Sequence, residues 1–193
     1  MVSRELNEHV RTFVAVEIKN QAVLRKLIEV RNQLVATGAE LKPVEDENIH
    51  LTLRFIGEIP LSLVRVLCSE ISGIKYPRFQ VHVKGLGAFP SPTRPRVLWA
   101  GVEEGGEKLV ELHNLVENTV RRIGIPPNRE EFVPHITLAR VKGLRGLDKL
   151  VKTVMILQNT DFGYTEIDEV VVKKSVLTPS GPIYSNLCTV KLE

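Results

Sequence analysis

Apolar residues recur at every third or fourth position in four stretches of the chain, which is the spacing of helices with one buried face. Residues 20–37 form the first stretch, and Gly38 follows it as a residue typical of the position just beyond a helix. The other stretches are residues 61–72, residues 107–123 and a segment that begins near Gly146. The pattern therefore predicts four amphipathic helices.

Stretches rich in β-branched residues, or alternating between apolar and polar residues, predict strands around these helices. In residues 79–84 the alternation places His82 on the polar side, so we expect this histidine to be exposed. Residues 85–96 contain three prolines and are expected to form a loop. Besides the two strands described next, strands are expected at residues 11–18, 97–102, 165–178 and 184–192.

Two further strands carry the same short motif. His50 is followed by Leu, Thr and Leu, and His135, in the second half of the chain, by Ile, Thr and Leu. Successive side chains of a strand point to opposite faces, so His50 shares a face with Thr52, and His135 shares one with Thr137. Each strand is therefore expected to bury leucine on one side and to present an imidazole and a hydroxyl on the other.

The separation between the two histidines recurs elsewhere in the chain, since the same offset aligns residues 12–15 with residues 97–100. This indicates an internal duplication. We expect a single bilobal α+β domain over residues 1–193, with related halves at about 11–96 and 97–193. In this arrangement of lobes, two antiparallel sheets with outer helices would flank a central groove.

A pair of histidines on facing strands provides both proton transfers of a displacement at phosphorus. Imidazole has an ordinary pKa of about 6.5, so it gives or takes a proton near neutral pH. Nucleophile and leaving group lie on opposite sides of phosphorus, so one imidazole acts as the base and the other as the acid. The two threonine hydroxyls supply donors for the nonbridging oxygens. A strained cyclic phosphate needs no metal for this chemistry, and we expect neither a metal nor a cofactor.

Other interpretations of the motifs are weaker. A zinc site is disfavoured because each motif offers one ligand and no Asp, Glu or Cys stands nearby at ligand spacing. A serine hydrolase needs a G-x-S-x-G turn, which the sequence lacks. A single His-x-Thr is most simply a structural pair, but its duplication favours catalysis. His113, beside the apolar stripe of its helix, is expected to be structural or exposed.

Composition narrows the class of protein without identifying it. Hydrophobic residues make up 43% of the chain and charged residues 25%, as in soluble globular proteins. The net charge of +3 permits a polyanionic partner without requiring one. Cys68 and Cys188 have no metal-like spacing and are expected to be reduced thiols. Because no apolar run is long enough to span a membrane, we expect a cytoplasmic protein, and we expect a monomer.

The sequence around both histidines resembles the RNA 2′,3′-cyclic phosphodiesterases, also called 2′-5′ RNA ligases, of the 2H phosphoesterase superfamily. The resemblance covers nearly the whole chain. It rests on His50-Leu-Thr-Leu-Arg-Phe-Ile-Gly57 and His135-Ile-Thr-Leu-Ala-Arg140, together with residues 11–15, 89–101 and 175–182. It implies a metal-free enzyme that hydrolyses 2′,3′-cyclic phosphate ends of RNA to 2′-phosphomonoesters, with reversible 2′-5′ ligation of tRNA halves as a further reaction.

The resemblance also implies roles for individual residues. Thr52 and Thr137 would bind the phosphate, His135 would activate water, and His50 would protonate the departing 3′ oxygen.

Arg140, in the fifth position after the second histidine, matches a family arginine that contacts substrate, and Phe55 stands at the same place in the first half. Together they would sandwich a base. Regular alternation puts both residues on the face opposite the histidines, unless the strands twist or bulge. Pro43 departs from the family pattern, in which an aromatic residue often follows the basic residue at the position of Lys42.

The path of the RNA and the substrate itself stay open at this point. Basic residues after the second motif would either guide an RNA strand or form an ordinary solvated surface: Lys142, Arg145, Lys149 and Lys152. The catalytic pair would equally serve a small cyclic phosphate, such as ADP-ribose cyclic phosphate, or a 2′-5′ oligonucleotide. A non-catalytic RNA end-binding protein is less favoured, because a pure binder needs cations and donors rather than intact His and Thr pairs.

Overall fold

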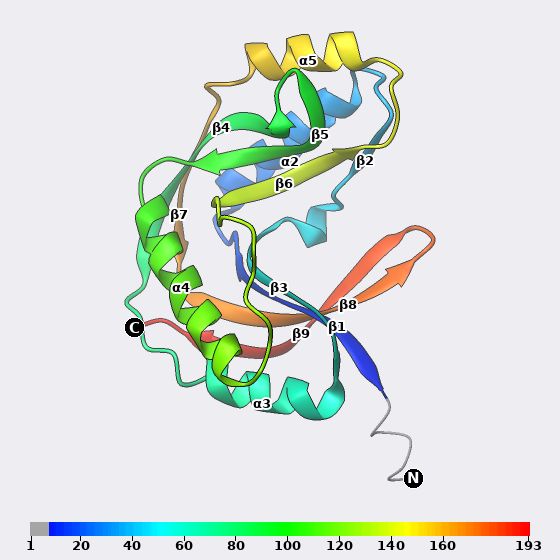
Figure 1. The fold of residues 1–193 in the computed structure, drawn as a ribbon. Coiled ribbons are helices and arrows are strands. Elements are labelled where there is room, and N and C mark those ends of the chain that lie inside the picture. Colours follow the sequence, from blue (N-terminus) through cyan, green and yellow to red (C-terminus); the bar gives the residue numbers. More distant parts are fainter. Residues whose placement is uncertain (1–7) are drawn as a thin grey trace.

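The computed structural model describes residues 8–193, and these form a nine-stranded antiparallel sheet with helices packed on it (Figure 1). The strand order is β7-β4-β5-β6-β3-β1-β8-β9, and β2 pairs with β6. The strands are β1 (His9–Glu17), β2 (Leu41–Pro43), β3 (His50–Pro60), β4 (Phe79–Ser91), β5 (Arg94–Val102), β6 (His135–Val141), β7 (Asp161–Ile167), β8 (Glu169–Thr178) and β9 (Gly181–Lys191). The predicted α+β class is confirmed.

The two strands that carry the histidine motifs are neighbours in the middle of the sheet. β3 and β6 pair at Leu51 and Ile136, each the residue directly after its histidine and therefore equivalent in the repeat. The strand order is symmetric about this pair. Going outward from β3, the next strands are β1 and β8, and going outward from β6 they are β5 and β4. An approximate twofold axis thus passes between β3 and β6, and both motifs lie next to it.

In each half of the chain, one helix packs against the strand that carries the histidine motif of the other half. α2 (Gln21–Val35) packs against β6 and β7, whereas α4 (Gly106–Arg122) packs against β3. α3 (Leu61–Ile71) packs on β1, β3 and β9, and α5 (Leu147–Ile156) packs on α2. All four lie close to their predicted ranges. The core includes fully buried leucines from these helices: Leu27, Leu34, Leu67, Leu109, Leu112 and Leu150.

No helix within residues 8–193 is long and apolar enough to cross a membrane.

The prediction of a loop at residues 85–96 is wrong, because this segment forms most of the β4–β5 hairpin. The prolines that suggested a loop gather at the hairpin end, where Pro90 pairs with Pro95 and Ser91 with Arg94. Proline is tolerated there because the ladder is ending and few backbone N–H donors are needed. The expected strand at residues 165–178 is likewise two strands, β7 and β8.

The expectation of two reduced cysteines is also wrong. Cys68 on α3 and Cys188 on β9 form a disulfide across a sequence separation of 120 residues. Spacing patterns detect cysteines that are close in sequence, whereas this pair is brought together by the packing of α3 on β9.

His82 is buried, with 6% of its surface exposed, where exposure was predicted. Its strand lies between β7 and β5, and the ring of Tyr164 on β7 stacks on the imidazole at 4.2 Å. Nε2 lies 2.8 Å from the Asp161 carboxylate. The neighbouring strand therefore covers the polar face that alternation alone assigns to solvent. His113 is structural, which is one of the two roles expected for it. Its Nδ1 donates to the Leu53 carbonyl at 2.8 Å.

Candidate active site

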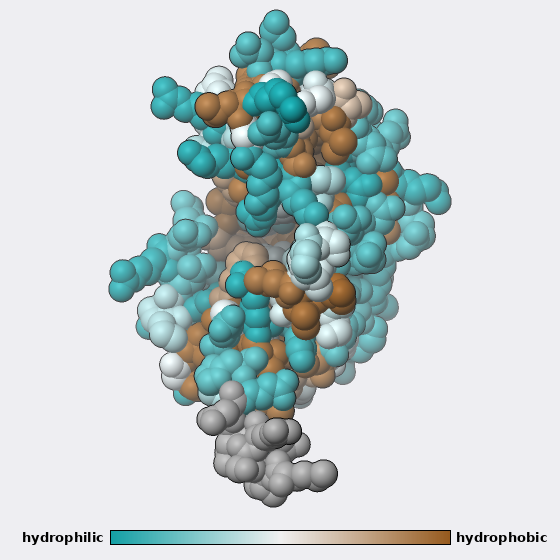
Figure 2. Space-filling model, turned by 90° about the vertical axis from the view of Figure 1, so that its right-hand side faces the viewer, coloured by the Kyte–Doolittle hydropathy of each residue, from teal (hydrophilic) through white to brown (hydrophobic). Residues whose placement is uncertain are grey.

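A cleft of about 1060 Å³ runs between the two lobes, and the residues of both motifs line it. It opens on the face shown in Figure 2, where a hollow separates an upper and a lower mass of side chains. β3 supplies His50 and Thr52, and β6 supplies His135 and Thr137. The cleft lies where a central groove was predicted, and all four residues of the two motifs line it.

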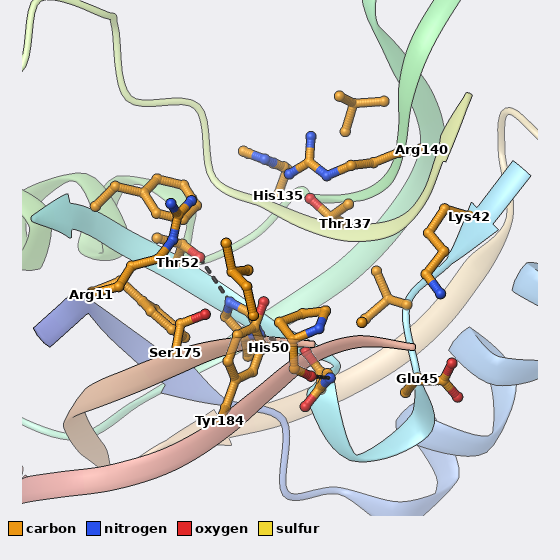
Figure 3. Close-up of a pocket in the computed structure, with 18 of the residues that line it drawn as sticks. Arg11, Lys42, Glu45, His50, Thr52, His135, Thr137, Arg140, Ser175 and Tyr184 are labelled. Carbon is orange, nitrogen blue, oxygen red and sulfur yellow. Dashed lines mark hydrogen bonds between the residues drawn. The ribbon is translucent and has the colours of Figure 1, made fainter. Parts of the chain in front are cut away.

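The imidazole of His50 is held at both ring nitrogens (Figure 3). Nδ1 lies 2.6 Å from the Asn48 carbonyl oxygen, and Nε2 lies 2.8 Å from the Thr52 hydroxyl. A carbonyl only accepts hydrogen bonds, so Nδ1 carries the hydrogen and Nε2 of the neutral ring accepts from Thr52. The neutral tautomer therefore presents its lone pair on the cleft side.

His135 repeats this arrangement in the second half. Its Nδ1 donates to the Val133 carbonyl at 2.6 Å, again two positions before the histidine. The Nε2 lone pair of the neutral ring is therefore the reactive atom here too. The two halves set the same tautomer by the same backbone contact.

Burial lowers the pKa of both histidines. For His50 it lowers the pKa to about 4, against the opposing effect of the Asn48 hydrogen bond. The rings of Phe13 and Tyr184 lie 5.1 and 5.4 Å from the His50 ring and keep water away from it. The pKa of His135 is also lowered, chiefly by burial. Both rings are therefore neutral at pH 7 in the free enzyme, and each can accept a proton at Nε2.

Both motif strands bulge at the residue after the threonine. In the ladder between β1 and β3, Ala15 pairs with Thr52 and Val14 with Arg54, so Leu53 is an extra residue. The ladder between β5 and β6 has the same irregularity, which makes Leu138 an extra residue. A bulge reverses the alternation that follows it.

Because of the bulges, Phe55 and Arg140 face the cleft. Regular alternation would have placed both residues on the face opposite the histidines. Phe55 is 61% exposed, and both residues line the cleft. Arg54 takes the buried position instead and pairs with Glu117 at 2.5 Å. All six predicted site residues therefore border one cavity.

The cleft also contains residues that were not predicted as site residues, although Arg11 and Ser175 lie in segments that carry the family resemblance. Arg11 and Ser175 line it beside Thr52, and Tyr184 lies edge-on over His50 (Figure 3). Ser175 and Tyr184 come from β8 and β9, near the other end of the chain from His50, and no local pattern links them to it. The pairing of β8 with β1 brings that hairpin to the site.

The basic residues after the second motif do not line the cleft as a group. Lys142 lines the cleft together with Lys42 and Pro43. Arg145 lies 3.5 Å from Glu40, and the exposed Lys149 and Lys152 on α5 are not among the lining residues. Among residues 8–193, no three His, Cys, Asp or Glu side chains gather in a group that could hold a metal ion.

Solved structures first define the class of protein. A Thermus thermophilus protein, TT0787, superposes with a TM-score of 0.75 at 28% identity, covering 94% of this chain and 97% of that one. Escherichia coli LigT in its apo form superposes with a TM-score of 0.78 at 23% identity, covering 96% and 99%. The fold is that of the LigT phosphoesterases.

Sequence comparison then gives the family. The LigT like phosphoesterase family matches residues 16–99 and, a second time, residues 101–184. The chain is 42% identical to an Aeropyrum pernix protein named RNA 2′,3′-cyclic phosphodiesterase, over 86% of this chain and 94% of that protein. It is 36% identical to one of the same name from Methanothermobacter thermautotrophicus, over 92% and 96%. The chain belongs to the LigT-like phosphoesterase family, and the double match reflects its duplication.

Proposed function

We propose that the chain is an RNA 2′,3′-cyclic phosphodiesterase that opens the cyclic phosphate at an RNA 3′ end and leaves a 2′-phosphomonoester. The observation that carries the proposal is the pair of neutral imidazoles, His50 and His135, whose Nε2 atoms face one cleft from equivalent strands. Hydrolysis of a phosphodiester needs one proton acceptor and one proton donor on opposite sides of phosphorus. The names of the relatives support the substrate.

In the reaction His135 is the base and His50 is the acid. His135 Nε2 takes a proton from water as the water oxygen bonds to phosphorus. The bond from phosphorus to O3′ breaks, and a proton from His50 Nε2 goes to O3′. Aromatic rings flank both imidazoles, since Phe89 and Trp99 lie beside His135 as Phe13 and Tyr184 lie beside His50. The greater burial of His50 supports this division, because attacking water reaches the less buried His135 more easily.

The phosphate itself prepares the acid. Burial lowers the pKa of His50 to about 4, and a phosphodiester anion next to the ring raises it. Once Nε2 carries a proton it no longer accepts from Thr52, and that hydroxyl turns to a nonbridging oxygen. Thr137 donates to the phosphate from the other strand, and Arg140 adds a positive charge. Phe55 offers an exposed ring to a base.

The partner is RNA, including tRNA halves. The same displacement with a 5′-hydroxyl in place of water forms a bond from O5′ to phosphorus as the bond to O3′ breaks, which gives 2′-5′ ligation. We propose a monomer that works in the cytoplasm. The disulfide is compatible with that compartment in hyperthermophiles, whose intracellular proteins are often disulfide-rich.

The test is hydrolysis of an oligoribonucleotide with a 2′,3′-cyclic phosphate end in the presence of a chelator. Wild-type protein should yield the 2′-phosphate, while His50→Ala and His135→Ala should each be slower by about 100-fold or more, the usual contribution of an acid or base. Equal thermal melting of the three proteins controls for folding. An inert wild type, or binding of the RNA end without turnover, would favour the RNA end-binding alternative.

A further inference from the structure

The β8–β9 hairpin carries large apolar side chains exposed at its end. Val176, Leu177 and Ile183 are 45%, 65% and 61% exposed. The hairpin projects from the sheet at the open side of the molecule (Figure 1), where apolar surface lies at the mouth of the hollow (Figure 2). Exposed apolar surface can mark a ligand-binding groove, so it matters which of these side chains face the cleft.

The two faces of this hairpin are distinct. Directly opposed residues of an antiparallel pair share a face, and Leu177 pairs with Pro182 as Ser175 pairs with Tyr184. These four residues line the cleft. Val176 and Ile183, which pair between them, therefore point away from it. Leu177 and Pro182 continue the wall that begins with Tyr184 over His50.

The hairpin end is fixed relative to the histidine strands. The Asn48 side-chain amide donates to the Pro182 carbonyl at 2.9 Å, and Lys42 Nζ donates to the Ser180 carbonyl at 2.8 Å. Asn48 is the residue whose own carbonyl holds His50. The apolar wall therefore has a set position beside the reacting phosphate.

Charge favours a nucleic acid as the occupant of this wall. The lysines of the hairpin strands are each paired with a carboxylate, Lys173 with Glu17, Lys174 with Glu8 and Lys191 with Glu169, so the charge that a ligand meets comes from the cleft lining. Arg11 and Lys42 line the cleft on the same side as the hairpin, with one carboxylate, Glu45, near Lys42 (Figure 3). The loop before β6 brings two carboxylates, Glu130 and Glu131, to the lining. A polyanion that leaves the phosphate site meets fewer carboxylates along the hairpin.

We propose that the cleft face of the β8–β9 hairpin binds the unpaired nucleotide that precedes the cyclic phosphate end, with its base packed against Leu177 and Pro182. The inference rests on the proposed function and makes a single-stranded RNA end, rather than a mononucleotide, the preferred substrate. A base has an apolar face that suits this wall, and it must be unpaired to expose that face.

The experiment compares adenosine 2′,3′-cyclic phosphate with a single-stranded hexaribonucleotide that ends in a 2′,3′-cyclic phosphate. Leu177→Ser should lower kcat/KM for the hexamer by about 5- to 10-fold, a modest share of the binding energy of one packed base, and leave the mononucleotide unchanged. Ile183→Ser, on the opposite face of the same hairpin, should change neither substrate. Both substitutions are neutral, so long-range charge is constant.

Equal loss on both substrates from Leu177→Ser would overturn the inference while leaving the proposed function intact, as would equal effects of the two variants. A change in sedimentation of the free protein on Leu177→Ser would also overturn it, because the cleft face of the hairpin would then bind a second copy of the chain. Failure of wild-type protein to hydrolyse either substrate would instead contradict the proposed function.

Discussion

Asn48 holds His50 in a way that has no counterpart in the second half of the molecule. Its carbonyl accepts from His50 Nδ1, as the Val133 carbonyl accepts from His135 Nδ1. Its buried side chain, however, also bonds to Pro182 on β9, which a valine at the equivalent place cannot do. Asn48 is therefore a positioning residue specific to the first histidine.

Replacing Asn48 with alanine should lower kcat about 10-fold on a cyclic phosphate RNA, because loss of a buried hydrogen bond costs roughly 1–1.5 kcal/mol and loosens His50. KM should change little, and the His50 Nδ1–H resonance should exchange faster with water in NMR spectra. Val133→Ala is the matched control. Equal losses in the two variants would mean that the side chain of Asn48 does not position the ring.

The lowered pKa values of the two histidines predict an acidic optimum for kcat/KM. The free enzyme with one protonated imidazole is most populated between the two pKa values, and a fixed share of it carries the proton on His50 and leaves His135 neutral, as the proposed roles require. One of the two pKa values is about 4, and the other lies below the ordinary 6.5. The rate should therefore fall as pH rises through a limb below 6.5. The kcat profile should extend to higher pH, because bound phosphate raises both values. An alkaline limb of kcat/KM above 6.5 would contradict the burial argument.

At the scale of elements, the matched bulges at Leu53 and Leu138 convert a simple alternating strand into one that presents three residues to the cleft. Each bulge adds the residue five places after the histidine to the same face. Because the two halves carry different residues there, Phe55 and Arg140, the bulges make the cleft chemically asymmetric.

Arg140→Ala should raise KM for cyclic phosphate RNA about 10-fold, since a charge-assisted contact to phosphate is lost. Arg145→Ala is a suitable control, because that arginine points to Glu40 and does not line the cleft. The measurement is steady-state hydrolysis at low salt. Equal effects of both substitutions would indicate general electrostatic attraction rather than a directed contact.

The limits of prediction from sequence follow from the same elements. Helices and the histidine strands were predictable because apolar spacing and the repeated motif can be read directly along the chain. The bulges were not, because an extra residue is defined by the partner strand. His82 was misjudged for a related reason, since the Tyr164 ring that covers it belongs to a strand in the other half of the chain. Ser175 and Tyr184 reach the site through the β1–β8 pairing, and no local sequence pattern predicts which distant strands will pair.

At the scale of the whole molecule, the disulfide ties the last strand to α3 across most of the chain. Closing a loop of 120 residues restricts the unfolded chain by about 4–5 kcal/mol in the chain-entropy model, and measured gains are usually smaller. The Cys68→Ser/Cys188→Ser double variant should therefore have a free energy of unfolding about 2–4 kcal/mol below that of the oxidised wild type.

Reducing agent should lower the stability of the wild type towards that of this double variant and leave the variant unchanged. The measurement is urea unfolding with and without dithiothreitol. Two titratable thiols in denatured, unreduced wild-type protein would contradict the disulfide.

The twofold arrangement of the molecule supports one central claim, that two equivalent histidines perform opposite proton transfers. The most direct test is a substrate whose 3′ oxygen is replaced by sulfur, because a thiolate leaves without a proton. His50→Ala should recover most of its lost rate on this substrate, whereas His135→Ala should stay impaired because water still needs a base. Recovery by His135→Ala instead would reverse the roles, and recovery by neither variant would contradict the division of acid and base between the two histidines.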